Sequence, residues 1–143
     1  MNRSGSVASA AIDFRNDLLG RNWPNDSEVV RFSRFSGSLD AAECIARARE
    51  ARILLGVWSA ARRAFVYPDF QFDRRGDLRP EVAELLTLLP KENDDAGWRS
   101  AFWLYSPHAN LGGQTPAEVF ESDPSRVLSV ALDEFYGDPD TAW

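Results

Sequence analysis

The chain has 143 residues, of which 44% are hydrophobic and 27% charged, the balance of an ordinary globular protein and not of a disordered one. Its single cysteine, Cys44, excludes an internal disulfide and any zinc site built from several cysteines. No apolar run approaches the roughly 20 residues that span a bilayer, and no apolar stretch of signal-peptide length follows Met1. We therefore expect a soluble, cytoplasmic protein that binds no membrane.

The formal net charge of −6 is unevenly distributed along the chain. Residues 1–63 carry ten arginines against seven acidic residues, giving +3. Residues 64–143 carry six basic against fifteen acidic residues, giving −9. This asymmetry indicates either two surfaces with different partners or an uneven scatter of solvated charges.

Helical spacing first occurs near the start of the chain. Residues 1–11 are small and polar and predict a frayed beginning. The apolar residues within 12–19 are then spaced as in a short helix, which stops at Gly20. A break follows, because Pro24 pushes Trp23 away from helical geometry.

Two short capped helices are expected after this break. The first covers residues 27–36 and ends at Gly37, and the second presents one weakly apolar face. The candidate caps are Asp26 or Ser27 for the first helix and Ser38 or Asp40 for the second. Two short helices joined by a glycine-containing turn form a unit of helix-turn-helix size.

A hairpin is predicted next. Residues 53–58 and 64–67 are rich in β-branched and aromatic side chains, and residues 59–63 form a connection of hairpin length. Pro68 ends the second strand, because proline cannot donate to a ladder. A two-stranded ribbon is marginal alone, so this hairpin, or wing, should pack on the helices.

Four further helices are expected in the second half. Pro80 opens the first and Pro90 stops it, and the next runs up to Pro107. Thr115 caps the third, and Asp123-Pro124 starts the last, which Gly137 ends. The expected core residues are Val82, Leu85, Leu86 and Leu89 in the first helix; Trp98, Ala101, Phe102 and Tyr105 in the second; and Val127, Leu128, Ala131, Leu132 and Phe135 in the last.

The expected fold class is therefore mainly α. It is a small helical bundle with an inserted, wing-like β-hairpin and a front unit of helix-turn-helix size. We expect two parts: residues 1–66, the helical front unit with the hairpin, and residues 67–143, a second helical domain.

No set of residues points to catalysis. Nucleophilic catalysis needs a nucleophile and a base within hydrogen-bonding reach. Cys44 is expected mid-helix as a small buried side chain, and His108, the single histidine, as a loop or cap residue. The acidic pairs Asp94-Asp95 and Asp138-Asp140 lack the ligand series of a calcium loop, and Gly112-Gly113 predicts a turn. We expect no enzyme activity, no cofactor and no metal.

One series of motifs is more specific than the composition. It consists of Tyr67-Pro68-Asp69-Phe70-Gln71-Phe72, then Gly76, Arg79-Pro80-Glu81-Val82, Trp98, Phe102-Trp103-Leu104, Pro107 and finally Leu111-Gly112-Gly113-Gln114-Thr115-Pro116-Ala117-Glu118-Val119-Phe120. In this order the motifs resemble the toxin-binding domain of Xre/MbcA/ParS-type antitoxins, most strongly over about residues 53–136.

The resemblance implies a protein with two tasks. Residues 67–143 would bind and block a cognate toxin, such as an NAD-consuming RES-type enzyme, and the front unit would bind operator DNA or form a homo-oligomer such as a dimer. The expected function is thus the antitoxin of a type II toxin–antitoxin pair, with autoregulation of its operon as an expected second role. The alternatives are a stand-alone winged-helix DNA-binding transcriptional regulator and a structural adaptor.

Four residues are candidates for toxin binding. Trp103 falls off the core-facing side of its helix and is expected at an interface, where tryptophan is over-represented. The resemblance implies a C-terminal end laid across the toxin's active cleft, where Asp138, Asp140 and Trp143 would bind. Gln71 is expected to be buried with its amide satisfied.

The candidates for DNA binding are arginines of the front half. A recognition helix and a wing can bring such side chains to phosphates. They are Arg47, Arg49, Arg52, Arg62 and Arg63. Arginines also solubilise helices, and an excess of +3 is small for a protein whose affinity comes from phosphate contacts.

Overall fold

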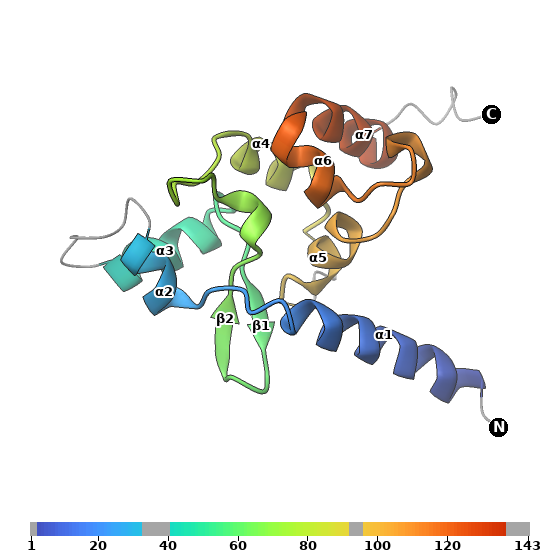
Figure 1. Cartoon of the computed structure of the whole chain (residues 1–143), viewed down its shortest axis with the longest axis horizontal. Helices are drawn as coiled ribbons and strands as arrows, with labels where there is room; N and C mark the ends of the chain where they lie inside the picture. The colour runs from blue at the N-terminus through green and yellow to red at the C-terminus, as the bar shows by residue number, and fades with distance from the viewer. Residues whose placement is uncertain (1–2, 33–40, 92–95, 137–143) are drawn as a thin grey trace.

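The computed structural model describes residues 3–32, 41–91 and 96–136. As the sequence predicts, the fold is mainly helical with one antiparallel hairpin (Figure 1). The helices are α1 (Arg3–Leu19), α2 (Asp26–Phe32), α3 (Ala41–Glu50), α4 (Glu81–Leu88), α5 (Trp98–Leu104), α6 (Pro116–Ser122) and α7 (Pro124–Tyr136); the strands are β1 (Val57–Ser59) and β2 (Ala64–Val66); η1 (Asp69–Gln71) and η2 (Ala109–Leu111) are 3-10 turns. Within these ranges no helix is both long and apolar enough to cross a bilayer.

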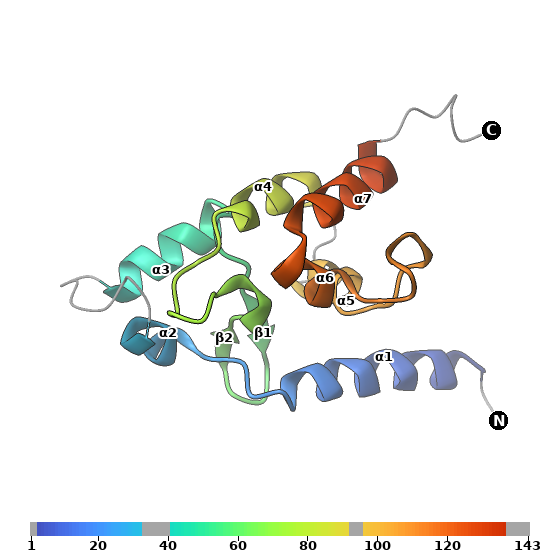
Figure 2. The same ribbon diagram turned by 45° about the horizontal axis from the view of Figure 1, so that its top comes forward.

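Helix α1 starts earlier than predicted, at Arg3 rather than near Ile12. Residues 3–11 include three alanines, which favour a helix, but no apolar spacing from which the start could be predicted. The C-terminal half of α1 docks on α5, where Phe14 stacks on Phe102 with ring centroids 5.2 Å apart. The N-terminal half extends past the rest of the molecule (Figures 1 and 2).

Helix α2 is capped by Asn25 and not by either predicted residue. The Asn25 side chain accepts from the backbone N–H of Glu28 at 3.0 Å, and Glu28 accepts in return from the Asn25 N–H at 3.2 Å. This reciprocal pair is a capping box. Asp26 has another partner, because its carboxylate accepts a hydrogen bond from the Tyr67 hydroxyl. The predicted end of this helix and the caps Ser38 and Asp40 lie outside the described residues.

The first strand is shorter than predicted. Residues 53–55 do not pair with a strand, because their backbone N–H groups have other partners. The N–H groups of Ile53 and Leu54 donate to the Ala48 carbonyl at the end of α3, and the Leu55 N–H donates to the Gln71 side chain at 2.6 Å. Gln71 is fully buried and satisfied, as expected, since its amide nitrogen donates to the carbonyls of Leu55 and Pro68.

The predicted core faces of α4 and α5 are largely confirmed. Val82, Leu85, Leu86, Leu89, Trp98, Ala101 and Tyr105 are all buried, whereas Phe102 is half-buried. Thr115 caps α6 as predicted, by accepting from the Glu118 N–H at 3.2 Å. Both Gly112 and Gly113 have positive φ, so the expected turn before this cap is confirmed.

Helix α7 differs from its predicted core face at one position. Val127 and Ala131 are buried, and Leu128 and Phe135 are half-buried. Leu132, however, is 50% exposed. Helices α4 and α7 lie side by side (Figure 2) and α6 packs on α7, but these neighbours cover only part of the apolar side of α7.

The buried residues form two clusters. The main cluster joins Leu18 of α1, Trp23, both strands and helices α4 to α7. The second is smaller and holds α2 and α3 to the hairpin through Val29, Ile45, Leu54, Tyr67 and Phe72. The main cluster therefore draws on both sides of the predicted boundary between residues 66 and 67, and a division there stays a prediction.

Two buried tyrosines have acidic partners. Burial, together with the Asp26 carboxylate, raises the pKa of Tyr67 well above its ordinary value. Burial and the charge of Asp69 do the same for the pKa of Tyr105. Both hydroxyls therefore remain protonated in the folded chain at neutral pH, as donors to these carboxylates.

Candidate functional site

A pocket with aromatic walls surrounds Trp103, the residue that the sequence singles out for an interface. The pocket has a volume of about 350 Å³. Its lining comes from the end of α4, from α5 and the turn after it, and from the last turn of α7; the residues are Leu89, Pro90, Arg99, Ser100, Phe102, Trp103, Ser106, His108, Glu134 and Phe135. Trp103 is half-buried, so one part packs on the main cluster and another stays accessible.

Three side chains hold the indole of Trp103 in place. Its Nε1–H donates to Glu134 Oε2 at 2.7 Å. Its ring lies 4.9 Å from the His108 ring and 5.7 Å from the Phe135 ring, between centroids. His108 Nε2 also lies 3.1 Å from the Trp103 carbonyl oxygen, and His108 is the residue before η2, so its expected place in a loop or cap is confirmed.

The surface of α7 beside this pocket is apolar and partly uncovered. Leu132 and Tyr136 are one helical turn apart and are 50% and 60% exposed. The Tyr136 hydroxyl donates to the Thr87 carbonyl oxygen near the end of α4. Phe135, between them in sequence, lines the pocket. The pocket and the two exposed side chains thus share the last turns of α7, although neither Leu132 nor Tyr136 lines the pocket.

Sequence reasoning missed Glu134 and His108 as members of this site. Their spacing of 26 positions carries no motif, and only the packing of α7 beside the turn after α5 brings them together. Leu132 was assigned to the core because its spacing is that of a core residue. A signal was nevertheless present, since α7 carries a wider apolar face than one helical neighbour covers.

The other three residues predicted to bind a toxin are Asp138, Asp140 and Trp143. They lie outside the described residues. Their role stays a prediction.

Two of the candidate DNA-binding arginines are half-buried and bonded within the fold. Arg49 donates to the Tyr67 hydroxyl at 2.8 Å, and its guanidinium carbon lies 3.9 Å from the centroid of the Phe65 ring. Arg52 donates twice to the Leu86 carbonyl oxygen, at 3.1 and 3.3 Å, and so ties the end of α3 to α4. Both side chains line the same small pocket, of about 130 Å³.

The other three candidate arginines are exposed. Arg62 and Arg63 lie in the turn of the hairpin, where Arg62 donates to the Trp23 carbonyl oxygen at 3.2 Å. Arg47 lies on α3 and pairs with Glu43. Glu43 and Glu50 are exposed on α3 as well, so that helix presents mixed charges rather than a basic face.

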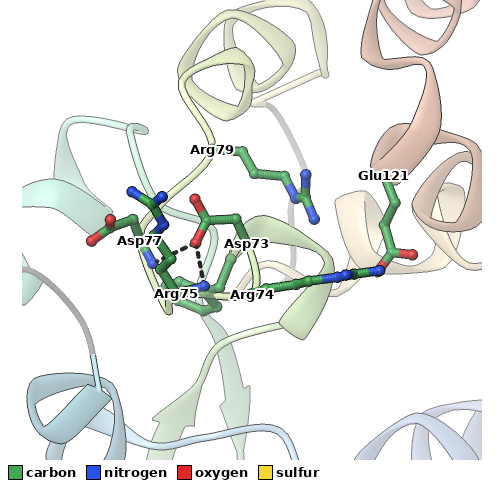
Figure 3. Close-up of a pocket in the computed structure, with 7 residues that line it drawn as sticks. Asp73, Arg74, Arg75, Asp77, Arg79 and Glu121 are labelled. Atoms are coloured by element: carbon green, nitrogen blue, oxygen red, sulfur yellow. Dashed lines mark hydrogen bonds between the residues drawn. The ribbon is translucent and has the colours of Figure 1, made fainter.

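A second, polar pocket lies between the loop after η1 and helix α6 (Figure 3). It has a volume of about 640 Å³ and is lined by Phe72, Asp73, Arg74, Arg75, Asp77, Arg79 and Glu121. Asp73 Oδ1 accepts from the backbone N–H groups of Arg75 and Asp77, which fixes the loop (Figure 3). The three arginines are balanced by three carboxylates around the pocket, so its charge favours neither cations nor anions.

The structure places the two chemically reactive candidates in different surroundings. Cys44 lies on α3 and is half-buried rather than fully buried as expected. His108 lies in the Trp103 pocket, which Cys44 does not line. Among residues 3–32, 41–91 and 96–136, no group of three His, Cys, Asp or Glu side chains is arranged to hold a metal ion.

Comparisons with known proteins return nothing: no family, no curated protein and no solved structure matches this chain.

Proposed function

We propose that this chain is the antitoxin of a type II toxin–antitoxin pair and binds its cognate toxin through the Trp103 pocket and the adjoining face of α7. The observation that carries the proposal is an accessible aromatic pocket beside the exposed side chains of Leu132 and Tyr136. Tryptophan and tyrosine in pockets provide much of the binding energy of protein interfaces. Exposed apolar patches on small proteins mark interaction sites.

The partner is assigned from two properties of the sequence. The order of motifs from Tyr67 to Phe120 resembles that of antitoxin domains, so the proposed partner is a cytoplasmic toxin, such as a RES-type enzyme that consumes NAD. The net charge of −9 over residues 64–143 favours a partner with a basic surface, because complementary charge steers association.

A stand-alone DNA-binding regulator has less support. Of the five candidate arginines, Arg49 and Arg52 are half-buried and bonded within the fold, and the exposed Arg62 also donates to the Trp23 carbonyl oxygen. The exposed side of α3 adds the carboxylates of Glu43 and Glu50, which would face the phosphates of DNA. A role in autoregulation would rest on Arg47, Arg62 and Arg63.

Growth rescue tests the proposal. The chain is co-expressed with the product of the neighbouring open reading frame, and we expect it to restore growth that this product inhibits. Leu132→Lys keeps helix propensity but places a cation on the exposed face of α7, so it should abolish rescue. Ile53→Lys is the matched control, because Ile53 is 44% exposed and lies outside this face.

Circular dichroism spectra should be the same for both variants and the unchanged chain. If the unchanged chain fails to restore growth, it is not the antitoxin of that product. If Leu132→Lys restores growth as well as Ile53→Lys does, the toxin docks elsewhere.

A further inference from the structure

The Trp103 pocket lies where three helices end. Leu89 and Pro90 follow α4 directly, Trp103 and Ser106 lie at the end of α5, and Phe135 lies in the last turn of α7. The C-terminal end of a helix carries a partial negative charge of up to about half an elementary charge, because its last carbonyl groups have no partner within the helix. The Leu86 and Phe102 carbonyl oxygens at two of these ends already accept hydrogen bonds from Arg52 and Ser106, so the helix ends alone do not select a cation.

A carboxylate is held in the same pocket. Glu134 Oε2 accepts the hydrogen bond from Trp103 Nε1, which fixes the side chain, and Oε1 lies 3.9 Å from His108 Nδ1. The Glu134 side chain is still 43% exposed. A guest in the pocket can therefore approach this carboxylate without breaking its bond to Trp103.

We propose that the pocket receives the guanidinium group of an arginine from the partner protein. The group would stack on an aromatic wall, Trp103 or Phe135, and pair with Glu134. This inference rests on the proposed function, because it names what the partner inserts. Cations are attracted to the faces of aromatic rings, tryptophan most of all, and more strongly in sites shielded from water.

The chain makes the same kind of contact with its own arginines. The guanidinium carbon of Arg15 lies 4.7 Å from the Trp98 ring centroid, and that of Arg49 lies 3.9 Å from the Phe65 centroid. Arginine fits the Trp103 pocket better than lysine does, because its planar group can stack on a ring and present a fork of N–H donors to a carboxylate at once.

Arg99 also lines the pocket, and its positive charge repels a cationic guest. Both side chains are exposed, so solvent screens both charges, but only the Glu134 carboxylate is fixed at the pocket by its hydrogen bond from Trp103. Replacing Arg99 by Gln should therefore strengthen the binding of a cation. This expectation gives the test a variant that improves binding as well as one that weakens it.

The test is a nuclear magnetic resonance titration of the isolated, full-length chain. The probe is N-acetyl-arginine amide, and the signal is the indole N–H resonance of Trp103, assigned by its loss in Trp103→Phe. N-acetyl-citrulline amide has nearly the same shape without the charge, and N-acetyl-lysine amide has the charge without the planar group. We expect a saturable shift with the arginine probe and binding at least about tenfold weaker with the other two.

Two variants of the pocket complete the experiment. Glu134→Gln keeps an oxygen that can accept from Trp103 but removes the charge, so it should weaken the arginine probe about tenfold. Arg99→Gln should strengthen it about twofold to threefold. Equal binding of the arginine and citrulline probes, no saturable shift, or unchanged binding by Glu134→Gln would each overturn the proposal. Equal binding of lysine and arginine would overturn the assignment to a guanidinium group.

This result is independent of growth rescue. Saturable binding of the arginine probe together with failed rescue would refute the toxin partner and leave the chemistry of the pocket standing. Rescue without binding of the probe would refute the arginine and leave the antitoxin role standing.

Discussion

Trp23 and Trp98 are both buried, but their indole nitrogens have different surroundings. Trp98 Nε1–H donates to the Trp58 carbonyl oxygen at 2.9 Å. Trp23 Nε1 is buried beside the ring of Tyr105 and has no hydrogen-bond partner among the described residues. An unpaired buried donor costs free energy that a paired one does not. The two tryptophans should therefore differ in how well each tolerates loss of the N–H group.

We expect Trp98→Phe to lower the free energy of unfolding by about 1–2 kcal/mol more than Trp23→Phe does. Both substitutions leave a similar cavity, so the difference isolates the hydrogen bond and the relief of an unpaired donor. Urea denaturation of the two variants measures it. An equal or larger loss for Trp23→Phe would contradict the structure around its indole.

Single residues of the site could be predicted from sequence when local spacing decided their position. Trp103 was found because it falls off the helical face set by Trp98, Ala101 and Tyr105. Glu134 was missed because its role depends on which helix lies next to α5. From the sequence, Arg49 and Arg52 are expected to be exposed cations. In the structure both side chains bend back to partners within the fold, as long side chains can do.

At the scale of elements, the backbones just before β1 and just before α5 approach so closely that Gly97 has no space for a side chain. Gly97, the residue before α5, has φ +93°. A Cβ atom on Gly97 would lie 2.1 Å from the Gly56 carbonyl oxygen. Nearby, the Trp58 N–H donates to the Ala96 carbonyl oxygen at 3.0 Å. The start of α5, and with it the Trp103 pocket, is positioned by this close approach of two backbones.

Gly97→Ala should therefore lower the free energy of unfolding by about 3 kcal/mol or more, from backbone strain and a clash together. Gly112→Ala is the control, because Gly112 also has positive φ, +66°, but a Cβ there has nothing within 4 Å. It should cost only about 1 kcal/mol. Chemical denaturation compares the two, and similar losses would show that crowding at Gly56 is unimportant.

Elements were predicted best where prolines and caps mark their ends. The predicted starts of α4, α6 and α7 all depend on proline, which fits the first helical turn and not the interior. The start of α1 was predicted too late because the long alanine-containing stretch carries no amphipathic pattern. The strand predicted at residues 53–55 is wrong because the N–H groups of Ile53 and Leu54 donate to the Ala48 carbonyl and that of Leu55 donates to the buried side chain of Gln71.

At the scale of the whole molecule, the basic residues of the front half separate into two groups. Arg49→Gln and Arg52→Gln should each lower the free energy of unfolding by about 1–2 kcal/mol, because each removes charged hydrogen bonds to groups that remain half-buried or buried. Arg47→Gln and Arg63→Gln should change it by less than about 0.5 kcal/mol, since both side chains are exposed.

Denaturation curves of the four variants check this division. Equal losses in all four would mean that the contacts of Arg49 and Arg52 contribute nothing to folding. The division also guides DNA experiments, since only variants that keep their stability can report on phosphate contacts.

Helix α1 is attached to the body at one end, through Phe14 and Leu18, and projects freely at the other (Figure 2). Docking supplies stability to its second half, whereas an isolated helix of its first few turns is marginal in water. Amide hydrogens along this single helix should consequently exchange with solvent at graded rates. Those near Leu18 are released only when the core opens, and those near Arg3 follow the local helix–coil equilibrium.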